Sequence, residues 1–231
     1  MAIERVPDSP LAERACNDLF TDDRKQLVES IGPGVRRASC DEAAALAALL
    51  ARAFAEEPIE QWCLACDDLF ALIELEFAEA VAQLVVAGSL WVSEDLSGAA
   101  AWIPPGADYD DAAIDAVVGP VLAAHGGSPE RRAAFWEWVE EHRPGTGHFY
   151  LDLVGVDPSR REAGIGTRLL TDGLARVDEA GEPAYLITSD AGHAAWYARH
   201  GFLVRSDEDP PAGGPRVWFM ERPSVTSRIW K

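Results

Sequence analysis

Two glycines at the start of a predicted helix, Gly164 and Gly166, have the spacing in this chain that most directly suggests chemistry. Around them the sequence predicts a strand over 148–156, a loop over 157–163 and a helix over 164–180. The first turn of a helix carries backbone N–H groups without intrahelical acceptors, at the positive end of the helix dipole. Because glycine has no side chain, a phosphate can approach these groups closely. The segment therefore predicts an anion site built mainly from backbone.

This motif differs from two common nucleotide-binding loops. A dinucleotide-binding G-x-G-x-x-G is incomplete, because Leu169 stands where the third glycine belongs and no acidic residue follows on a strand about 20 residues later. No Gly-Lys-Ser/Thr follows, which excludes a P-loop. Taken alone, the two glycines are equally explained by a tight turn from strand to helix.

The four cysteines predict neither a disulfide framework nor a metal site. Cys16, Cys40, Cys63 and Cys66 are irregularly spaced, and no second Cys/His pair at zinc spacing accompanies the C-x-x-C of Cys63 and Cys66. We therefore expect reduced thiols in packing roles and no metal cofactor.

The elements that must hold the loop form a layered α/β (α+β) domain around a mixed sheet. Residues 1–34 read as an N-terminal extension, with a short helix over 11–30 and a break at Gly32-Pro33-Gly34. Residues 35–231 read as a single domain. Strands are predicted over 35–38, 90–93, 99–103, 148–156, 184–188, 202–205 and 217–221, and helices over about 41–55, 67–87, 108–124, 129–142, 164–180 and 191–200.

Charge is unevenly distributed along the chain. With 20 basic and 39 acidic residues, the formal net charge of −19 argues against binding to nucleic acid or to anionic lipid. Between Asp41 and Glu130 there are 17 acidic residues and one basic residue, Arg52. Beside an open cleft such a stretch would attract cationic ligands; otherwise it is a solubilising surface.

The sequence shows neither the pattern of a signal peptide nor that of a membrane-spanning segment. The first residues lack the basic start and apolar segment of a signal peptide, and no apolar run of about 18 residues occurs. We therefore expect a cytoplasmic protein without a membrane partner, as a monomer or a homodimer.

The glycine loop belongs to a longer pattern that resembles the acetyl-CoA-binding core of the GNAT N-acetyltransferases. The residues that carry the resemblance are Leu153, Val154, Val156 and Pro158, then Arg161-x-x-Gly164-x-Gly166, and later Trp196-Tyr197-x-x-x-Gly201-Phe202. It covers roughly Val35 to Arg222. Segments 184–189, 196–202 and 213–220 further resemble the branch that contains puromycin N-acetyltransferase, whose members acetylate amines of small molecules.

The resemblance implies a largely antiparallel central sheet, flanked by helices, with a splayed parallel pair of strands that binds acetyl-CoA. In this family the strand matching 153–156 pairs with the pantetheine arm, and one of its N–H groups polarises the thioester carbonyl. The loop matching 161–167 wraps the pyrophosphate. The implied cofactor-binding residues are Leu153, Val154, Gly155, Val156, Arg161, Glu162, Ala163, Gly164, Ile165, Gly166, Thr167, His193 and Tyr197.

The same resemblance implies a proton donor. Tyr197 matches the family tyrosine that commonly protonates the departing CoA thiolate, and positioning compensates for its ordinary pKa near 10. The alternative is an aromatic anchor that holds the helix beside Trp196.

A proton must also leave the acceptor ammonium before attack, and Asp152 is the leading candidate for the base. Without a bulge, residues 150, 152, 154 and 156 share one strand face that leads toward the thioester. Gly155 is a candidate bulge that would disturb this inference. Asp152 has two other interpretations, a binding site for the cationic acceptor or a plain polar strand position. Tyr150 on the same face is expected to line the acceptor pocket.

Three residues depart from the family pattern. Glu162-Ala163 replaces a glycine and a basic residue, which places a negative charge near the pyrophosphate. His193 stands where the branch usually has asparagine; it is a candidate to bond the cofactor or Tyr197, or a surface histidine. Ile187 replaces a common glutamate.

The leading function is transfer of acetyl from acetyl-CoA to a primary amine of a small cationic molecule. Antibiotic resistance or self-protection is the purpose that the branch resemblance suggests. Two alternatives stay open at this stage: a non-catalytic CoA-binding sensor or partner protein, and a protein N-acetyltransferase.

Overall fold

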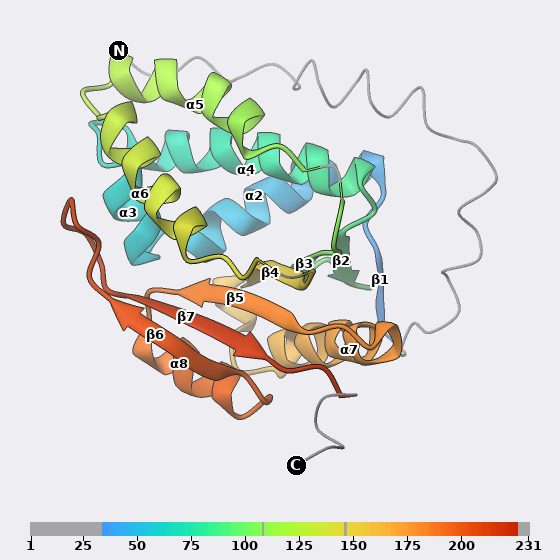
Figure 1. The fold of residues 1–231 in the computed structure, drawn as a ribbon. Helices are drawn as coiled ribbons and strands as arrows, with labels where there is room; N and C mark the ends of the chain where they lie inside the picture. The colour runs from blue at the N-terminus through green and yellow to red at the C-terminus, as the bar shows by residue number, and fades with distance from the viewer. Residues whose placement is uncertain (1–33, 108, 146, 226–231) are drawn as a thin grey trace.

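A seven-stranded sheet forms the centre of the molecule (Figure 1). The computed structural model describes residues 34–225 apart from 108 and 146, so the helix expected over 11–30 lies outside the described residues. The strand order is β1-β2-β3-β4-β5-β7-β6, and only β4 and β5 are parallel neighbours. The strands are β1 (Val35–Arg37), β2 (Leu90–Ser93), β3 (Gly98–Ile103), β4 (Phe149–Val156), β5 (Ala184–Thr188), β6 (Leu203–Glu208) and β7 (Val217–Arg222). The predicted fold class, a largely antiparallel sheet with one parallel pair, is confirmed.

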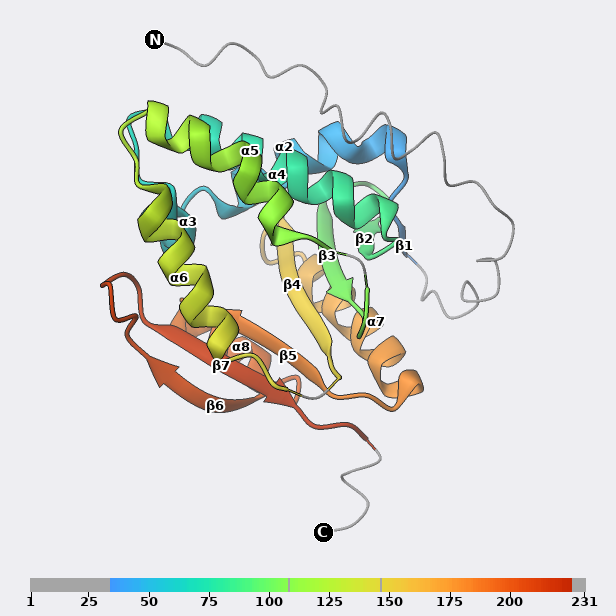
Figure 2. The same ribbon diagram turned by 45° about the horizontal axis from the view of Figure 1, so that its top comes forward.

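Helices cover both faces of this sheet, each over its own apolar core (Figures 1 and 2). One face is covered by α2 (Ala43–Phe54), α3 (Pro58–Cys63), α4 (Leu69–Val86), α5 (Asp111–Ala124) and α6 (Pro129–Glu141). The other face is covered by α7 (Ile165–Ala180) and α8 (Ala191–Ala198). Leu50, Leu72 and Phe135 are buried in the first core, and Leu169 and Phe202 in the second.

The parallel strands β4 and β5 pair only at their beginnings. Their register contains two pairs, Phe149 with Ala184 and Tyr150 with Tyr185. Beyond these pairs the strands diverge, while β4 stays paired with β3 as far as Val156. The edge of β4 over 153–156 that would have met β5 therefore faces a gap, with backbone groups available to a ligand. This is the splayed pair that the family resemblance implied.

The bulge in β4 lies at Asp152. Ala101 pairs with Leu153 and Trp102 pairs with Leu151, so Asp152 is the extra residue between two register pairs. The predicted common face of residues 150, 152, 154 and 156 is therefore wrong. One extra residue reverses the alternation, so Tyr150 packs with the α2–α6 core while Val154 and Val156 pack on the α7–α8 side.

Gly155, the candidate bulge, pairs in register with Ala99. A Cβ atom at this position would lie 2.5 Å from Leu50 Cδ2 and 3.1 Å from Phe54 Cε2 of α2. The glycine is needed because helix α2 approaches the strand closely, a tertiary requirement that the sequence alone could not separate from a bulge.

Most predicted elements are present within a few residues of their predicted ends, but α3 was not predicted. The preceding helix α2 ends at Phe54, close to its predicted end at 55, and Pro58 is then the first residue of a new helix, where its missing N–H costs nothing. Six residues are too few to show a helical period. Ile59 and Cys63 on this short helix are buried in the core.

The cysteines follow the prediction only in part. Cys63 and Cys66 are free thiols, and Cys63 is completely buried, in agreement with a packing role. Cys40 is disulfide-bonded, so the expectation of reduced thiols is wrong at this position. Pairing depends on how close two thiols lie in the fold, which sequence spacing does not reveal.

Candidate active site

One large cleft, with a volume of about 1200 Å³, opens where β4 and β5 separate. Its walls come from the α2–α3 connection, α4, α5, α6, β4, the start of α7 and α8. All predicted site residues except Ala163 line it: Tyr150, Asp152, Leu153, Val154, Gly155, Val156, Arg161, Glu162, Gly164, Ile165, Gly166, Thr167, His193 and Tyr197. The structure thus brings together residues that are almost 50 positions apart in the sequence.

The predicted anion site lies at one end of this cleft, at the start of α7. Gly164 is the N-cap with φ +76°, and no side chain caps the helix, so its first N–H groups remain available. Glu162 also has a left-handed backbone, with φ +69°, a conformation that favours glycine. A Cβ atom at Gly166 would make ordinary contacts with Val156 and Val154 at 3.5 and 3.8 Å, so the glycine leaves room above β4. This geometry suits a phosphate ligand.

Two arginines of the same loop are bound to the protein itself. Arg161 Nη2 donates to the Ala53 carbonyl oxygen at 3.2 Å, and Arg160 Nη2 lies 3.3 Å from Asp95 Oδ2. These contacts fix the loop against α2 and the β2–β3 turn. The predicted anion site therefore consists of backbone N–H groups more than of arginine charge.

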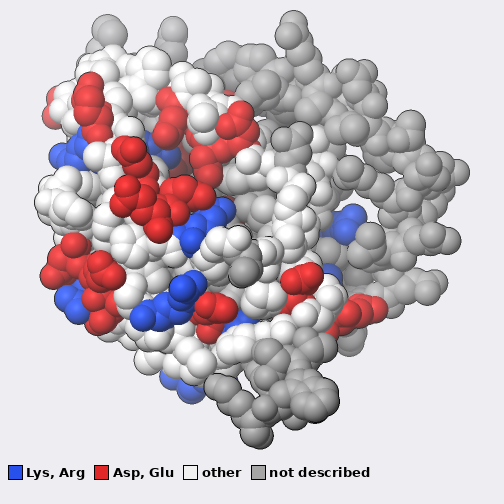
Figure 3. Space-filling model, in the orientation of Figure 1, with Lys and Arg blue, Asp and Glu red and all other residues white. Residues whose placement is uncertain are grey.

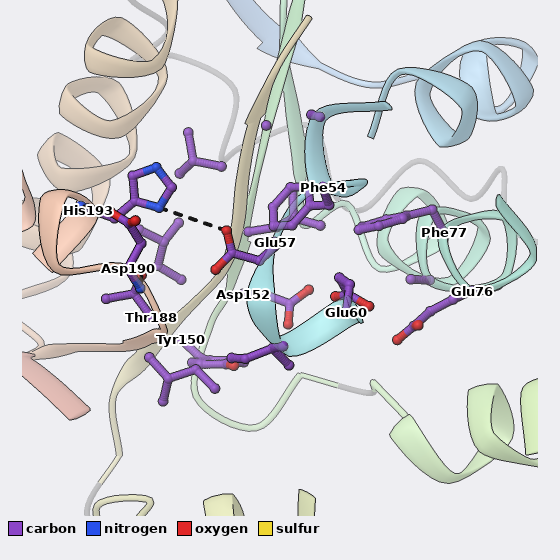
Figure 4. Close-up of a pocket in the computed structure, with 18 of the residues that line it drawn as sticks. Phe54, Glu57, Glu60, Glu76, Phe77, Tyr150, Asp152, Thr188, Asp190 and His193 are labelled. Carbon is purple, nitrogen blue, oxygen red and sulfur yellow. Dashed lines mark hydrogen bonds and ion pairs between the residues drawn. The ribbon is translucent and has the colours of Figure 1, made fainter. Parts of the chain in front are cut away.

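Asp152 projects from its bulge into the middle of the cleft (Figure 4). Burial raises the pKa of its carboxyl to about 7, with a further contribution from Asp111, while Arg143 opposes the shift. A carboxyl that titrates near neutral pH can gain and lose a proton under working conditions. Tyr150 lies beside it, and burial together with the Asp152 charge raises the pKa of the Tyr150 phenol well above its usual value.

Tyr197, on α8, lines the cleft and also packs among aromatic rings. Its ring centroid lies 4.8 Å from that of Trp196 and 5.8 Å from that of Phe202. Burial and the charge of Glu57 raise the pKa of its phenol, so the hydroxyl stays protonated at neutral pH. Both interpretations of Tyr197, as an anchor and as a proton donor, are therefore compatible with its place.

His193 lies one helical turn before Tyr197 on α8, and its side chain lies close to Glu57. Its side chain is 59% exposed, and Nδ1 lies 4.0 Å from Glu57 Oε2. Glu57 Oε1 also accepts a 2.7 Å hydrogen bond from Ser189 Oγ. Glu57 thus spans the gap between the start of α3 and the end of β5 (Figure 4). Sequence reasoning missed this residue, because one acid in an acidic stretch carries no distinguishing signal.

The end of the cleft opposite the α7 loop contains a buried ion cluster that was also missed. Arg132 of α6 contacts Glu76 of α4 at 2.9 Å and Asp115 of α5 at 2.8 Å, and Glu60 of α3 lies nearby. These residues come from four helices, and no motif links them. Over the described residues, no group of three or more His, Cys, Asp or Glu side chains has the arrangement of a metal site. None of the described helices has the length and apolar character needed to cross a membrane.

Comparisons with known proteins agree with this geometry. The sequence profile of the Acetyltransferase (GNAT) family matches residues 46–202. The fold is similar to a structure described as histone acetyltransferase HPA2 and related acetyltransferase from Corynebacterium glutamicum, with 24% identity over 84% of this chain and 98% of that chain and a TM-score of 0.64.

Two insect enzymes share the fold at lower identity. Arylalkylamine N-acetyltransferase 2 from Aedes aegypti is 14% identical over 82% of this chain and 97% of that chain, with a TM-score of 0.57. A polyamine N-acetyltransferase from Drosophila melanogaster is 17% identical over 81% of this chain and 97% of that chain, with a TM-score of 0.54. The family match covers more than half of the chain and includes the start of α7 and the splayed strands β4 and β5. The chain therefore belongs to the GNAT family and is an acetyl-CoA-dependent N-acetyltransferase.

Proposed function

We propose that this enzyme transfers the acetyl group of acetyl-CoA to a primary amine of a small cationic molecule. The observation that carries the proposal is Asp152, a half-buried residue at a strand bulge in the cleft, whose pKa is raised to about 7. A carboxylate there attracts an ammonium group and can then accept its proton.

The charge of the helix-side wall of the cleft supports a cationic acceptor. In Figure 3 acidic side chains gather over α5 and α6, whereas acidic and basic side chains alternate over β6 and β7. The wall contains more acids than bases, and Arg132 already contacts two of those acids. The acids are Glu56, Glu57, Glu60, Glu76, Asp111, Asp115, Glu137 and Glu140, and the bases are Arg132 and Arg143. Such a wall concentrates cations near the reacting groups.

The cofactor side of the cleft fits acetyl-CoA, which supplies the activated acetyl group. We assign pyrophosphate binding to the backbone of the loop 161–167, where the first N–H groups of α7 are available. We assign the pantetheine arm and the thioester carbonyl to the open edge of β4 over 153–156, which β5 leaves unpaired. A fixed backbone N–H there stabilises the negative charge that develops on the carbonyl oxygen.

Two side chains, Asp152 and Tyr197, carry out the proton transfers. Asp152 accepts a proton from the ammonium, so that the neutral nitrogen forms a bond to the acetyl carbon. As the carbon–sulfur bond breaks, Tyr197 donates its hydroxyl proton to the departing sulfur. The newly bonded nitrogen then loses its second proton, which restores the Tyr197 hydroxyl, and Asp152 releases its proton to solvent. Burial keeps the pKa of Tyr197 high and its proton in place until that step.

An amine-bearing antibiotic is one acceptor of this chemical class. If such an antibiotic is acetylated, we propose that the role of the enzyme is antibiotic resistance or self-protection. The resemblance of segments 184–189, 196–202 and 213–220 to the puromycin N-acetyltransferase branch motivates this choice. The two insect structures carry the names of amine acetyltransferases, but at 14% and 17% identity they support the fold alone.

The test is acetyl-CoA turnover against a panel of aminonucleosides, other amine-bearing antibiotics, diamines and arylalkylamines. We expect turnover with at least one small cationic amine and mass-spectrometric detection of its N-acetyl product. Asp152→Asn should lower that turnover by about 10³-fold, whereas Asp67→Asn, at an exposed position outside the cleft, should leave it unchanged. CoA binding without acetylation of any amine would contradict the proposal. Acetylation of peptides but of no small amine would contradict the small-molecule acceptor and indicate a protein N-acetyltransferase.

A further inference from the structure

The last turn of α2 packs directly on strand β4 at the open edge of that strand. A Cβ atom at Gly155 would lie 2.5 Å from Leu50 Cδ2, 3.1 Å from Phe54 Cε2 and 3.4 Å from Ala53 Cβ. The side chains of α2 therefore fill the space above Gly155 up to van der Waals contact. The cleft has a volume of about 1200 Å³ as a whole, but at this point its wall is closed.

Phe54, the last residue of α2, is the part of this wall that faces the cleft. Its side chain is half-buried and lines the cleft, whereas Leu50 is completely buried in the core. The ring centroid of Phe54 lies 5.1 Å from that of Phe77 on α4. In the view of Figure 4 Phe54 lies between Glu57 and Phe77 and above Asp152. The wall at this point therefore consists of a large apolar ring supported from behind by a second one.

The end of α2 is also bound to the loop that follows β4. Arg161 Nη2 donates to the Ala53 carbonyl oxygen at 3.2 Å, and Arg52 Nη2 donates to Asp157 Oδ2 at the same distance. These contacts oppose an outward movement of the helix end. A larger ligand therefore gains little room at Phe54 by displacing the helix.

In the proposed mechanism the acyl group lies beside this wall. The thioester carbonyl is assigned to the open edge of β4 over 153–156, and the attacking nitrogen is assigned to Asp152. The acyl carbon has to lie between these two groups. Phe54 contacts the strand at Gly155, only three residues after Asp152, and strand residues follow one another at about 3.3 Å. The ring therefore borders the reacting centre.

We propose that Phe54 determines the length of the acyl group that the enzyme accepts and restricts it to acetyl. The methyl group of acetyl fits between the open edge of β4 and the Phe54 ring, and each further methylene would meet that ring. This inference rests on the proposed function, because it uses the position assigned there to the thioester.

The experiment compares the binding of acetyl-CoA and butyryl-CoA by calorimetry, without an amine. We expect the wild-type enzyme to bind butyryl-CoA about tenfold or more weakly, since one methylene too many in an apolar pocket already has an effect of this size. Phe54→Ala removes the ring and should bring the ratio of the two Kd values near to one. The ratio of kcat/KM values with the best amine of the panel should change in the same direction.

Two further variants keep the proposal open to refutation. Phe70→Ala removes the same kind of side chain from an exposed position of α4 outside the cleft and should keep the wild-type ratio. Phe54→Leu keeps an apolar side chain against Phe77 but shortens the wall, so its ratio should be intermediate. This variant also serves if Phe54→Ala does not fold.

The outcomes separate this inference from the proposed acceptor chemistry. Equal affinity of the wild-type enzyme for the two thioesters would overturn the assignment of Phe54 and leave amine acetylation standing. So would a wild-type ratio in Phe54→Ala or, if that variant does not fold, in Phe54→Leu. A ratio that depends on Phe54, combined with turnover of no amine, would support the wall and overturn the proposed acceptor.

Discussion

The two halves of the cleft offer different kinds of groups to their ligands. The half that we propose binds the cofactor, here called the cofactor half, consists of the open edge of β4 and the loop 161–167 and offers mainly backbone N–H groups. The half that we propose binds the amine, here called the acceptor half, consists of Asp152 and the wall contributed by α2 to α6. It offers charged side chains such as Glu57, Glu60 and Glu76. Backbone groups suit a cofactor that a whole family shares, whereas side chains can change from one acceptor to another. Changes in one half should therefore leave the ligand of the other half largely unaffected.

Asp152→Asn is the strongest test of this separation. In the proposed mechanism Asp152 is the base, so its loss should lower kcat/KM for a cationic amine by about 10³-fold, within the range of general acid–base catalysis. The affinity for CoA should stay within about twofold. Steady-state kinetics and calorimetry with CoA measure the two effects. A comparable loss of CoA affinity would show that the halves are not separate.

Tyr197→Phe tests a residue at the border of the halves. In the proposed mechanism Tyr197 is the proton donor, so its removal should lower kcat by about 10²-fold. Because the ring still packs against Trp196 and Phe202, the melting temperature should change little. If kcat is unchanged and the melting temperature falls, Tyr197 is an anchor only.

The pH dependence should belong to the acceptor half. Asp152, the proposed base, can accept a proton only when it is ionised, and its pKa is raised to about 7. We therefore expect kcat/KM to contain an inflection near pH 7, below which it falls by about tenfold per pH unit. Asp152→Asn should retain only the titration of the amine itself. An inflection near pH 7 that persists in this variant would assign it to another group.

Ionic strength should have a smaller effect on the acceptor half. The acidic wall over α5 and α6 attracts a cationic amine through a field that salt screens. Between about 20 and 500 mM salt we expect kcat/KM for such an amine to fall several-fold. An arylamine that is neutral at the assay pH is the control and should show no comparable fall. Equal salt dependence for both would reduce the acidic wall to a solubilising surface.

The smallest predicted change lies in the cofactor half, at Glu162. This residue has φ +69°, and its charge stands at the anion site. Glu162→Gly relieves a left-handed conformation that costs an L-residue about 1–2 kcal/mol and removes the charge, so the Kd for CoA should decrease by a few-fold. Glu162→Gln removes only the charge, and the difference between the two variants measures the backbone contribution. Weaker CoA binding in Glu162→Gly would contradict this view of the loop.

Prediction from the sequence succeeded where neighbouring residues determine structure. The hairpin of β2 and β3, the strand β4 and the helix α7 with its glycine start all follow from local patterns, and they contain most of the cofactor half. Prediction failed where distant segments decide. The sequence predicted a candidate bulge at Gly155, but the bulge lies at Asp152. The register of β4 depends on its pairing with β3, which the sequence does not reveal.

What the sequence determined by itself is the family, the order of the elements and the glycine start of α7, since these depend on residues close together in the chain. Only the tertiary structure decided which carboxyls share the acceptor half. Glu57 and Glu60 flank a proline that begins a short helix, and Glu76 meets Arg132 across more than 50 residues. Burial and mutual repulsion then set the protonation of Asp152 and Glu60. These effects depend on distance in space, and an acidic stretch in the sequence does not show which of its members will meet.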